Sequence, residues 1–332
     1  MVRKDGKIIY QHGFGLADLE TKEKINPHSS FRMASVSKQF FAAAILLCQD
    51  KGLLTVKDPV TNYISNDHLA GITIENLVQH TSGIGTYYDE ALNTWDDNKN
   101  RNNADMIKYF KEFYPKPFFE PGEKYQYCNP GYELLVTVIE TVSGQNIYEF
   151  MDENIFHPLG MTETQVFEGI IDFHCPQRVM GYTEKKDKFV EDDYTFLNCL
   201  IGAGGLYTSL NDYSKWLESL DKQTLLSSES TEMMYKPARL NDGSIASVNK
   251  RTLKDFILPD ASTYSSYGYG WVVSKGDPST VSHSGSWVGF RNNIYRNINT
   301  GLDVVIFSNR GATLERWIRD ALKIIDKTIL DY

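Results

Sequence analysis

The chain has 332 residues, of which 41% are hydrophobic and 23% are charged, close to the fractions of ordinary globular proteins. This length favours two domains or one large domain, and this composition excludes a disordered or fibrous chain. Lys and Arg number 34 against 43 Asp and Glu, which gives a formal net charge of −9. An acidic chain without a long basic block is a poor binder of nucleic acids.

Membrane-spanning and zinc-binding classes are also disfavoured. The best apolar run, residues 40–47, is much shorter than the about 20 residues that a membrane helix needs. The 4 cysteines include no CxxC pair, and the sequence contains no HExxH motif. We therefore expect neither a disulfide scaffold nor a zinc site.

The first predicted element is a short strand at Lys7–Tyr10, preceded by a hairpin turn at Asp5-Gly6. Residues 1–7 are basic, as at the start of a signal peptide, but no long apolar segment follows them. The sequence as given therefore predicts a cytoplasmic protein. An exported protein is the alternative if the N-terminus was trimmed.

Helices are predicted through the next two hundred or so residues. Apolar residues between 40 and 47 recur at helical spacing, which predicts a buried helix that begins near Ser35 and ends at Gly52. Residues 53–84 predict short helices and turns, and helical patterns follow at 104–113, 132–142 and 147–155. Ser209 with Asp212 indicates another helix start, where Asp212 is expected to be a capping residue and not a catalyst.

The pattern changes again near the C-terminus. Residues 241–266 are polar and predict a connecting loop, and strands are predicted at 270–274, 289–296 and 302–307. Apolar residues spaced along 314–325 predict a C-terminal amphipathic helix. We therefore expect residues 1–58 and 265–332 to form one α/β domain and residues 59–264 a mostly helical second domain. A cleft between the two is the natural ligand site.

Three short motifs could carry chemistry. In Ser35-Val36-Ser37-Lys38, residues i and i+3 share a helix face, so the Lys38 amine can reach the Ser35 hydroxyl. A serine is a weak nucleophile until a base takes its proton, and burial at a helix N-terminus disfavours the ammonium form of a lysine. Taken alone, the motif is more often a helix cap followed by a solvated lysine.

The second motif is Tyr127-Cys128-Asn129, which lies between a Pro- and Gly-rich loop and a helix. A tyrosine hydroxyl can transfer protons when a cation stabilises its phenolate, and an asparagine amide can bind a substrate carbonyl and a lysine. The alternative is an aromatic anchor followed by a helix cap. Cys128 has packing as its simplest role.

The third motif is His283-Ser284-Gly285-Ser286, between two predicted strands. Gly285 would let a ligand lie along a sheet edge, and the Ser286 N–H could donate to a developing oxyanion. An ordinary tight turn is the alternative.

In chain order the motifs read SxxK, YxN and HxG, and this set resembles the superfamily of serine β-lactamases and penicillin-binding proteins. The YxN form is similar to that of class C β-lactamases, the D,D-peptidases of the same branch, and related esterases and D-aminopeptidases. The likeness covers nearly the whole chain. The segments that carry it are 13–18, 31–40, 53–64, 80–84, 121–122, 158–161, 204–212, 267–271, 283–290 and 308–309.

The resemblance implies an α/β (α+β) fold in which an antiparallel sheet of N- and C-terminal strands is flanked by helices, with a mostly helical inserted domain. It implies that Ser35 is acylated and that Lys38 and Tyr127 activate it and protonate the leaving group. It places Asn129, His283, Gly285 and Ser286 in substrate binding, with the Ser35 and Ser286 N–H groups as the oxyanion hole. No metal or organic cofactor is needed.

One departure from the family bears on the substrate. The third motif of β-lactamases and transpeptidases usually begins with a lysine that holds a substrate carboxylate, whereas His283 is mostly neutral near pH 7. We therefore expect an ester or amide hydrolase acting on a small molecule or peptide, with ester turnover above nitrocefin turnover. The alternatives are a D-amino-acid peptidase or D,D-carboxypeptidase, a weak β-lactamase, or a catalytically silent penicillin-recognising binding protein.

Two further groups of residues have structural interpretations. The segment 80–83, His-Thr-Ser-Gly, is expected to be a structural corner near the cleft. Tyr87, Tyr88 and Trp95 would line the cleft or belong to the core. The physiological substrate and the oligomeric state are not readable from the sequence.

Overall fold

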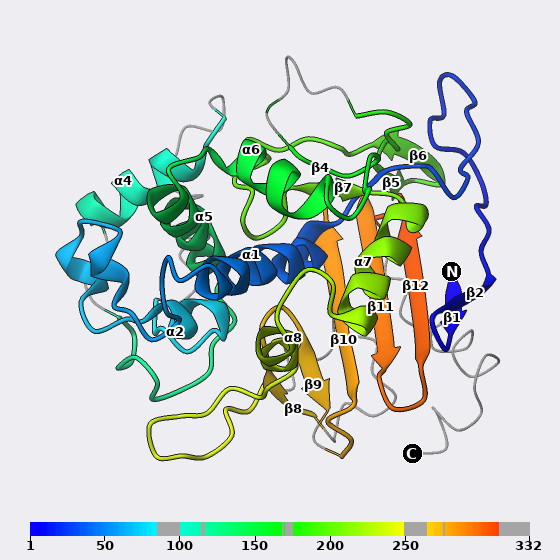
Figure 1. The fold of residues 1–332 in the computed structure, drawn as a ribbon. Coiled ribbons are helices and arrows are strands. Elements are labelled where there is room, and N and C mark those ends of the chain that lie inside the picture. The colour runs from blue at the N-terminus through cyan, green and yellow to red at the C-terminus, as the bar shows by residue number, and fades with distance from the viewer. Residues whose placement is uncertain are drawn as a thin grey trace.

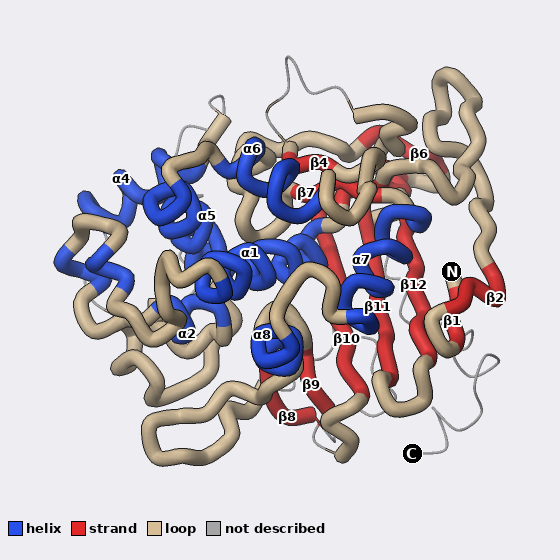
Figure 2. Tube along the Cα trace, in the orientation of Figure 1, coloured by secondary structure: helices blue, strands red, loops and turns tan. Residues whose placement is uncertain are grey.

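The computed structural model describes residues 1–84, 100–113, 117–167, 169, 175–248, 264–274 and 276–311. The predicted C-terminal helix at 314–325 lies outside the described residues, and so do Tyr87, Tyr88 and Trp95. Figures 1 and 2 show a sheet with helices packed against one of its faces and a largely helical region beside it.

The main sheet has seven strands in the order β2-β1-β12-β11-β10-β9-β8, and every pair of neighbours is antiparallel. Its strands are β1 (Val2–Lys4), β2 (Lys7–Tyr10), β8 (Tyr264–Tyr267), β9 (Val272–Ser274), β10 (Thr280–Trp287), β11 (Phe290–Asn297) and β12 (Leu302–Ser308). This sheet and its flanking helices confirm the predicted fold class.

The two ends of the described chain meet in this sheet. Strand β1 pairs with β12, with Val2 opposite Val304. Strands β1 and β2 form a hairpin whose turn residues Asp5 and Gly6 have φ angles of 51° and 74°, values that the Asp-Gly pair accommodates. The division of the chain into two domains stays a prediction.

The helices follow the apolar periodicity of the sequence. They are α1 (Lys38–Asp50), α2 (Ile74–Val78), α4 (Asn103–Phe113), α5 (Asn129–Ser143), α6 (Ile147–Met151), α7 (Leu210–Lys222) and α8 (Ser228–Met234). Helix α1 is buried over 38–48, as expected of a helix that is apolar on all sides. It lies at the centre of the molecule, and α7 and α8 lie over one face of the sheet (Figure 1).

The ends of several helices are set by residues at or beside them. Gly144 ends α5 with a φ of 69°, in the left-handed region that glycine enters without strain. The predicted helix at 147–155 is confirmed as α6, which continues as a π-helix, η4 (Asp152–Phe156). Ser35 lies in a short 3₁₀-helix, η1 (Ala34–Ser37), that leads directly into α1.

The prediction of a loop over residues 241–266 is wrong at its C-terminal end. Residues from Tyr264 onward form β8, the outermost strand of the main sheet, which pairs with β9. The segment carries few large apolar residues, so its strand character depends on the pairing partner and not on its own pattern. Small sheets formed by β3 (Phe31–Arg32), β7 (Leu206–Thr208) and β4 (Gln165–Val166), and by β5 (Tyr182–Lys185) and β6 (Lys188–Glu191), were also not expected.

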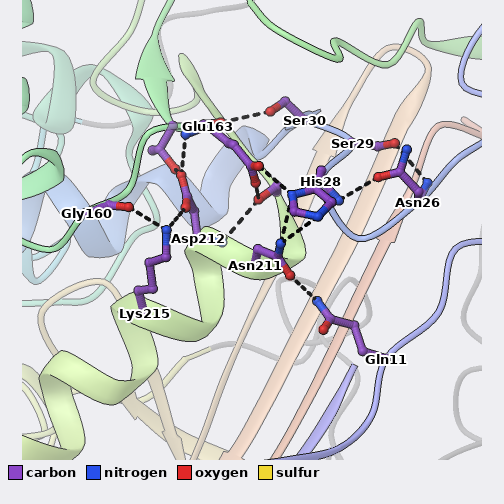
Figure 3. Close-up of polar contacts among 12 residues, drawn as sticks. Gln11, Asn26, His28, Ser29, Ser30, Gly160, Glu163, Asn211, Asp212 and Lys215 are labelled. Atoms are coloured by element: carbon purple, nitrogen blue, oxygen red, sulfur yellow. Dashed lines mark hydrogen bonds and ion pairs between the residues drawn. The ribbon is translucent and has the colours of Figure 1, made fainter.

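Asp212 is a structural residue, as predicted. Its backbone N–H donates to the Ser209 hydroxyl, which caps α7. The Asp212 carboxylate, fully buried, accepts the Glu163 N–H at 2.6 Å and pairs with Lys215 at 2.7 Å. Figure 3 shows how this carboxylate and Glu163, which bonds His28, connect α7 to two loops.

Asp212→Ala is expected to lower the free energy of unfolding by about 2–4 kcal/mol, because the buried Glu163 N–H loses its acceptor. Urea denaturation measures the change. Glu218→Ala on the same helix is the control, since that carboxylate is 49% exposed and pairs with Lys222 at the surface; its effect should stay within about 0.5 kcal/mol. Equal, small effects of both substitutions would contradict the bracing role of Asp212.

Within the described residues, no helix has the length and apolar character needed to cross a membrane.

Candidate active site

The SxxK motif brings a serine hydroxyl and a lysine amine into contact. Lys38 Nζ donates to Ser35 Oγ at 3.1 Å. The tight 3₁₀ turn of η1 places residues i and i+3 on one side, and Ala34 holds a φ of 49° at its start. The Ser37 hydroxyl accepts the Leu206 N–H of β7 at 3.1 Å, which fixes η1 to the neighbouring strand. Ser35 itself is half-buried, so its hydroxyl lies at the edge of the packed core.

Lys38 is buried in surroundings that disfavour its charge. The side chain is 0% exposed, and besides Ser35 its amine donates to the Ala203 carbonyl at 2.8 Å. Burial lowers the pKa of Lys38 to about 7, although the nearby Glu133 acts in the opposite direction. A large fraction of this lysine is therefore the free amine at neutral pH, the form that can accept a proton.

The YxN motif also lies close to the Lys38 amine. Lys38 Nζ is 5.0 Å from the centre of the Tyr127 ring and 5.5 Å from that of Tyr132. Asn129 begins α5, with Pro130 as the next residue, where the missing N–H of proline costs nothing. Its Oδ1 is buried, and the described residues give it no hydrogen-bond donor. The predicted role of Asn129 in substrate binding stays a prediction.

Cys128 is buried within this motif, and burial raises the pKa of its thiol to about 12. Such a thiol is not the reactive thiolate form. Its backbone N–H donates to His80 Nδ1 at 3.1 Å. Cys128 therefore contributes to packing and backbone position and not to nucleophilic chemistry.

His80 lies at a corner beside the site, with a φ of 58°. Its ring packs among four tyrosines, with ring centres at 4.2 Å for Tyr127, 4.5 Å for Tyr267, 5.3 Å for Tyr132 and 6.1 Å for Tyr125. Burial holds the pKa of His80 well below its usual value. The predicted structural corner thus also packs directly against the Tyr127 ring.

The third motif is not a turn between two strands. His283, Ser284, Gly285 and Ser286 all lie inside β10, so the predicted position between two strands was wrong, and so was the alternative of a tight turn. Strand β10 pairs with β11 along its whole length, but β9 pairs only with Val281 and Ser282. The hydrophobic pattern of the sequence did not indicate this strand, because Val281 is the one large aliphatic residue in it. Its strand form depends on pairing with neighbours.

Gly285 is required by the approach of β10 to η1. A Cβ atom at this position would lie 2.2 Å from the Met33 carbonyl oxygen. Only glycine allows this close approach, which brings β10 alongside the turn that carries Ser35. Ser286 follows Gly285 in the strand and is exposed.

His283 carries no positive charge toward a substrate. Its Nδ1 contacts the Ser284 carbonyl at 2.7 Å and its Nε2 contacts the Tyr267 hydroxyl at 2.8 Å. These contacts fit a neutral ring whose Nδ1–H donates and whose Nε2 accepts. Burial, with Lys38 as the next cause, lowers the pKa of His283 to about 3. Both ring nitrogens are therefore engaged within the protein.

Sequence motifs did not single out two residues that complete this site. Tyr267 connects His283 to the tyrosine cluster, and Glu133 is a buried acid near Lys38. Tyr267 opens the segment 267–271, which carries part of the family resemblance, but no role was predicted for it; Glu133 lies in none of those segments, and only its spatial neighbours reveal it. Among the described residues, no group of three or more His, Cys, Asp or Glu could hold a metal ion.

Comparisons with known proteins show the family of this chain. A family model described as Beta-lactamase matches residues 1–328. Penicillin-binding protein 4* of Bacillus subtilis (strain 168) is 30% identical over 325 residues, covering 93% of this chain and 67% of that protein.

Solved structures share the fold. The octameric penicillin-binding protein homologue from Pyrococcus abyssi superposes with a TM-score of 0.82 at 25% identity, covering 98% of this chain and 72% of that one. The D-amino acid amidase from Ochrobactrum anthropi SV3 superposes with a TM-score of 0.75 at 21% identity, covering 95% and 88%. At 21% identity the second likeness shows the fold alone.

Proposed function

This chain belongs to the Beta-lactamase family and is a serine hydrolase, and we propose that it acts by acyl transfer through Ser35 on ester or amide substrates. The observation that carries the proposal is the 3.1 Å contact between Lys38 Nζ and Ser35 Oγ. A buried amine at that distance can take the hydroxyl proton as the oxygen attacks a carbonyl carbon.

In the first half of the reaction, Ser35 Oγ forms a bond to the carbonyl carbon and its proton passes to Lys38. The negative charge on the carbonyl oxygen is stabilised by the backbone N–H groups of Ser35 and Ser286. The bond to the leaving amine or alcohol then breaks, and the proton returns to that group through Lys38 and Tyr127. Tyr127 is suited to this step because its ring lies beside the Lys38 amine.

In the second half, water attacks the acyl-enzyme and restores Ser35, with Lys38 and Tyr127 accepting the proton of the water. Asn129 binds the substrate amide, and its buried Oδ1, which accepts no hydrogen bond from the described residues, supports this role. Gly285 keeps β10 close enough to η1 for the two N–H groups to converge.

The substrate assignment depends on His283. A substrate carboxylate is best held by a cation, whereas this ring is neutral and bonded on both nitrogens. We therefore place esters and uncharged amides ahead of β-lactams, whose carboxylate would lack the usual lysine. D-amino-acid peptides are the second candidate, because one neighbour of the same fold is a D-amino acid amidase.

A fluorophosphonate probe tests the proposal directly. Intact mass spectrometry is expected to show one adduct on the wild type and none on Ser35→Ala. Steady-state assays should then show turnover of p-nitrophenyl acetate above that of D-alanyl peptides and nitrocefin. No adduct on the wild type, or an equal adduct on Ser35→Ala, would refute the nucleophile, and nitrocefin as the best substrate would refute the substrate order.

The same assays distinguish a serine hydrolase from a catalytically silent binding protein. Such a protein would not turn over esters, whereas the proposed mechanism requires ester turnover that is lost in Tyr127→Phe. Turnover that persists unchanged in this variant would point to hydrolysis elsewhere on the protein.

A further inference from the structure

Glu133 is a buried acid behind the active site, one turn after Asn129 on α5. It is 1% exposed. One carboxylate oxygen, Oε1, accepts the Ala203 N–H at 2.9 Å, and the other, Oε2, accepts the Gly202 N–H at 2.8 Å. The Asn103 amide also donates to Oε2, at 3.1 Å. A carboxylate that accepts successive backbone N–H groups holds that backbone in one conformation.

The backbone held in this way carries the second partner of the catalytic amine. The Ala203 carbonyl accepts a hydrogen bond from Lys38 Nζ at 2.8 Å. Gly202 is confined from the other side as well, because a Cβ there would lie 2.1 Å from the Tyr132 carbonyl oxygen. The backbone at Gly202 and Ala203 is therefore held by Glu133 and Tyr132 of α5, and the Ala203 carbonyl that it carries is the second hydrogen-bond partner of the Lys38 amine.

Glu133 is also the carboxylate whose charge acts on Lys38, since it raises the pKa of that amine. Other titratable groups around the amine are uncharged near pH 7: burial raises the pKa of the Cys128 thiol and of the Tyr132 phenol, and it lowers the pKa of the His80 and His283 rings. The Tyr127 ring also lies beside the amine. Burial raises the pKa of Glu133, and the three N–H donors and Lys38 counteract that effect by favouring the carboxylate.

We propose that Glu133 is a positioning residue for the reaction: it holds the Ala203 carbonyl that orients the Lys38 amine, and it supplies the negative charge that this amine faces. The inference rests on the proposed function, because it assigns a role through Lys38. It requires no contact between Glu133 and the substrate.

Glu133→Gln tests the two roles together. The amide keeps one acceptor oxygen but places an NH₂ group against a backbone N–H, so we expect kcat to fall about 10- to 100-fold with KM changed less than about threefold. Loss of the negative charge favours the free amine of Lys38. The acidic limb of kcat/KM, where Lys38 loses its proton, should therefore move to lower pH.

Glu140→Gln is the matched control, since it removes one negative charge from the same helix and, like Glu133→Gln, changes a carboxylate that accepts a backbone N–H, here that of Ile147 at 3.0 Å. The acidic limb of kcat/KM in this control should stay at the pH of the wild type. Glu133→Asp keeps the charge but shortens the side chain, so kcat should fall while the limb stays near that of the wild type. This variant keeps the proposal testable if Glu133→Gln does not fold.

An acidic limb that stays in place in Glu133→Gln, or that moves equally in Glu140→Gln, would overturn the proposal, and so would a limb that moves in Glu133→Asp. The fluorophosphonate adduct separates this failure from that of the proposed function. A wild type that is not acylated at Ser35 refutes the function, whereas an acylated wild type combined with an unmoved limb refutes only the role of Glu133.

Discussion

Lys38→Met is expected to lower ester turnover by about 10³- to 10⁴-fold while leaving the protein at least as stable as the wild type. The loss of activity follows because no other base is hydrogen-bonded to Ser35 in the described structure. Methionine is unbranched and close in size, so it fills the same buried space. Steady-state kinetics and urea denaturation of both proteins measure the two effects.

The stability part follows from the pKa of the lysine. In the unfolded chain Lys38 has its ordinary pKa of 10.5, and in the folded protein the pKa is about 7. Between these pH values the unfolded chain binds more protons, so wild-type stability rises with pH across that window. Near pH 7 the buried lysine therefore destabilises the fold by on the order of 4 kcal/mol.

Methionine removes this destabilisation but leaves the Ala203 carbonyl without its donor, at a cost of about 1–3 kcal/mol. It also leaves Glu133 without its nearby cation. The stability difference between Lys38→Met and the wild type should shift in favour of the wild type as pH rises from about 7 toward 10. A variant that loses several kcal/mol at pH 7, or a difference that does not change with pH, would contradict the burial of an amine whose pKa is lowered to about 7.

Gly285→Ala is the second substitution with a large expected effect. The added Cβ would lie 2.2 Å from the Met33 carbonyl oxygen, and neither of the two backbones can rotate away as a side chain could. Strand β10 and η1 must separate, which moves the Ser286 N–H away from Ser35. Since misplacement by about 1 Å can cost 10²-fold, we expect kcat/KM to fall at least that much and the free energy of unfolding to fall by about 1–3 kcal/mol.

Gly276→Ala provides the matched control. This glycine precedes the same strand, and a Cβ there would meet no heavy atom within 4 Å. Activity and thermal midpoint should stay close to wild-type values. If Gly285→Ala kept full activity at an unchanged midpoint, the close approach of β10 to η1 would not be needed for catalysis.

Much of the fold and site could be predicted because the relevant signals are local. The strand at Lys7–Tyr10, the end of α5 at Gly144 and the start of α7 at Ser209 each depend on a few adjacent residues. The SxxK spacing is also local, since three residues of a helical turn suffice to bring Lys38 to Ser35.

Other features depend on distant partners and were missed or misjudged. Strand β10 has too few large apolar residues for a strand pattern, and it forms because β11 pairs with it from end to end. The contacts of the His283 ring with Tyr267 and with the Ser284 carbonyl were not predicted, and its role in substrate binding stays a prediction. Such contacts join segments that no periodicity relates.

The sequence by itself therefore determined the three motifs, their order along the chain and the residues that we propose to carry the chemistry. Only the tertiary structure decided their protonation and geometry, because desolvation depends on what surrounds a group in space. Burial makes Lys38 a base near neutral pH and keeps His283 uncharged. The approach of β10 to η1, and the hold of Glu133 on the backbone beside Lys38, likewise arise only when segments far apart in the chain pack together.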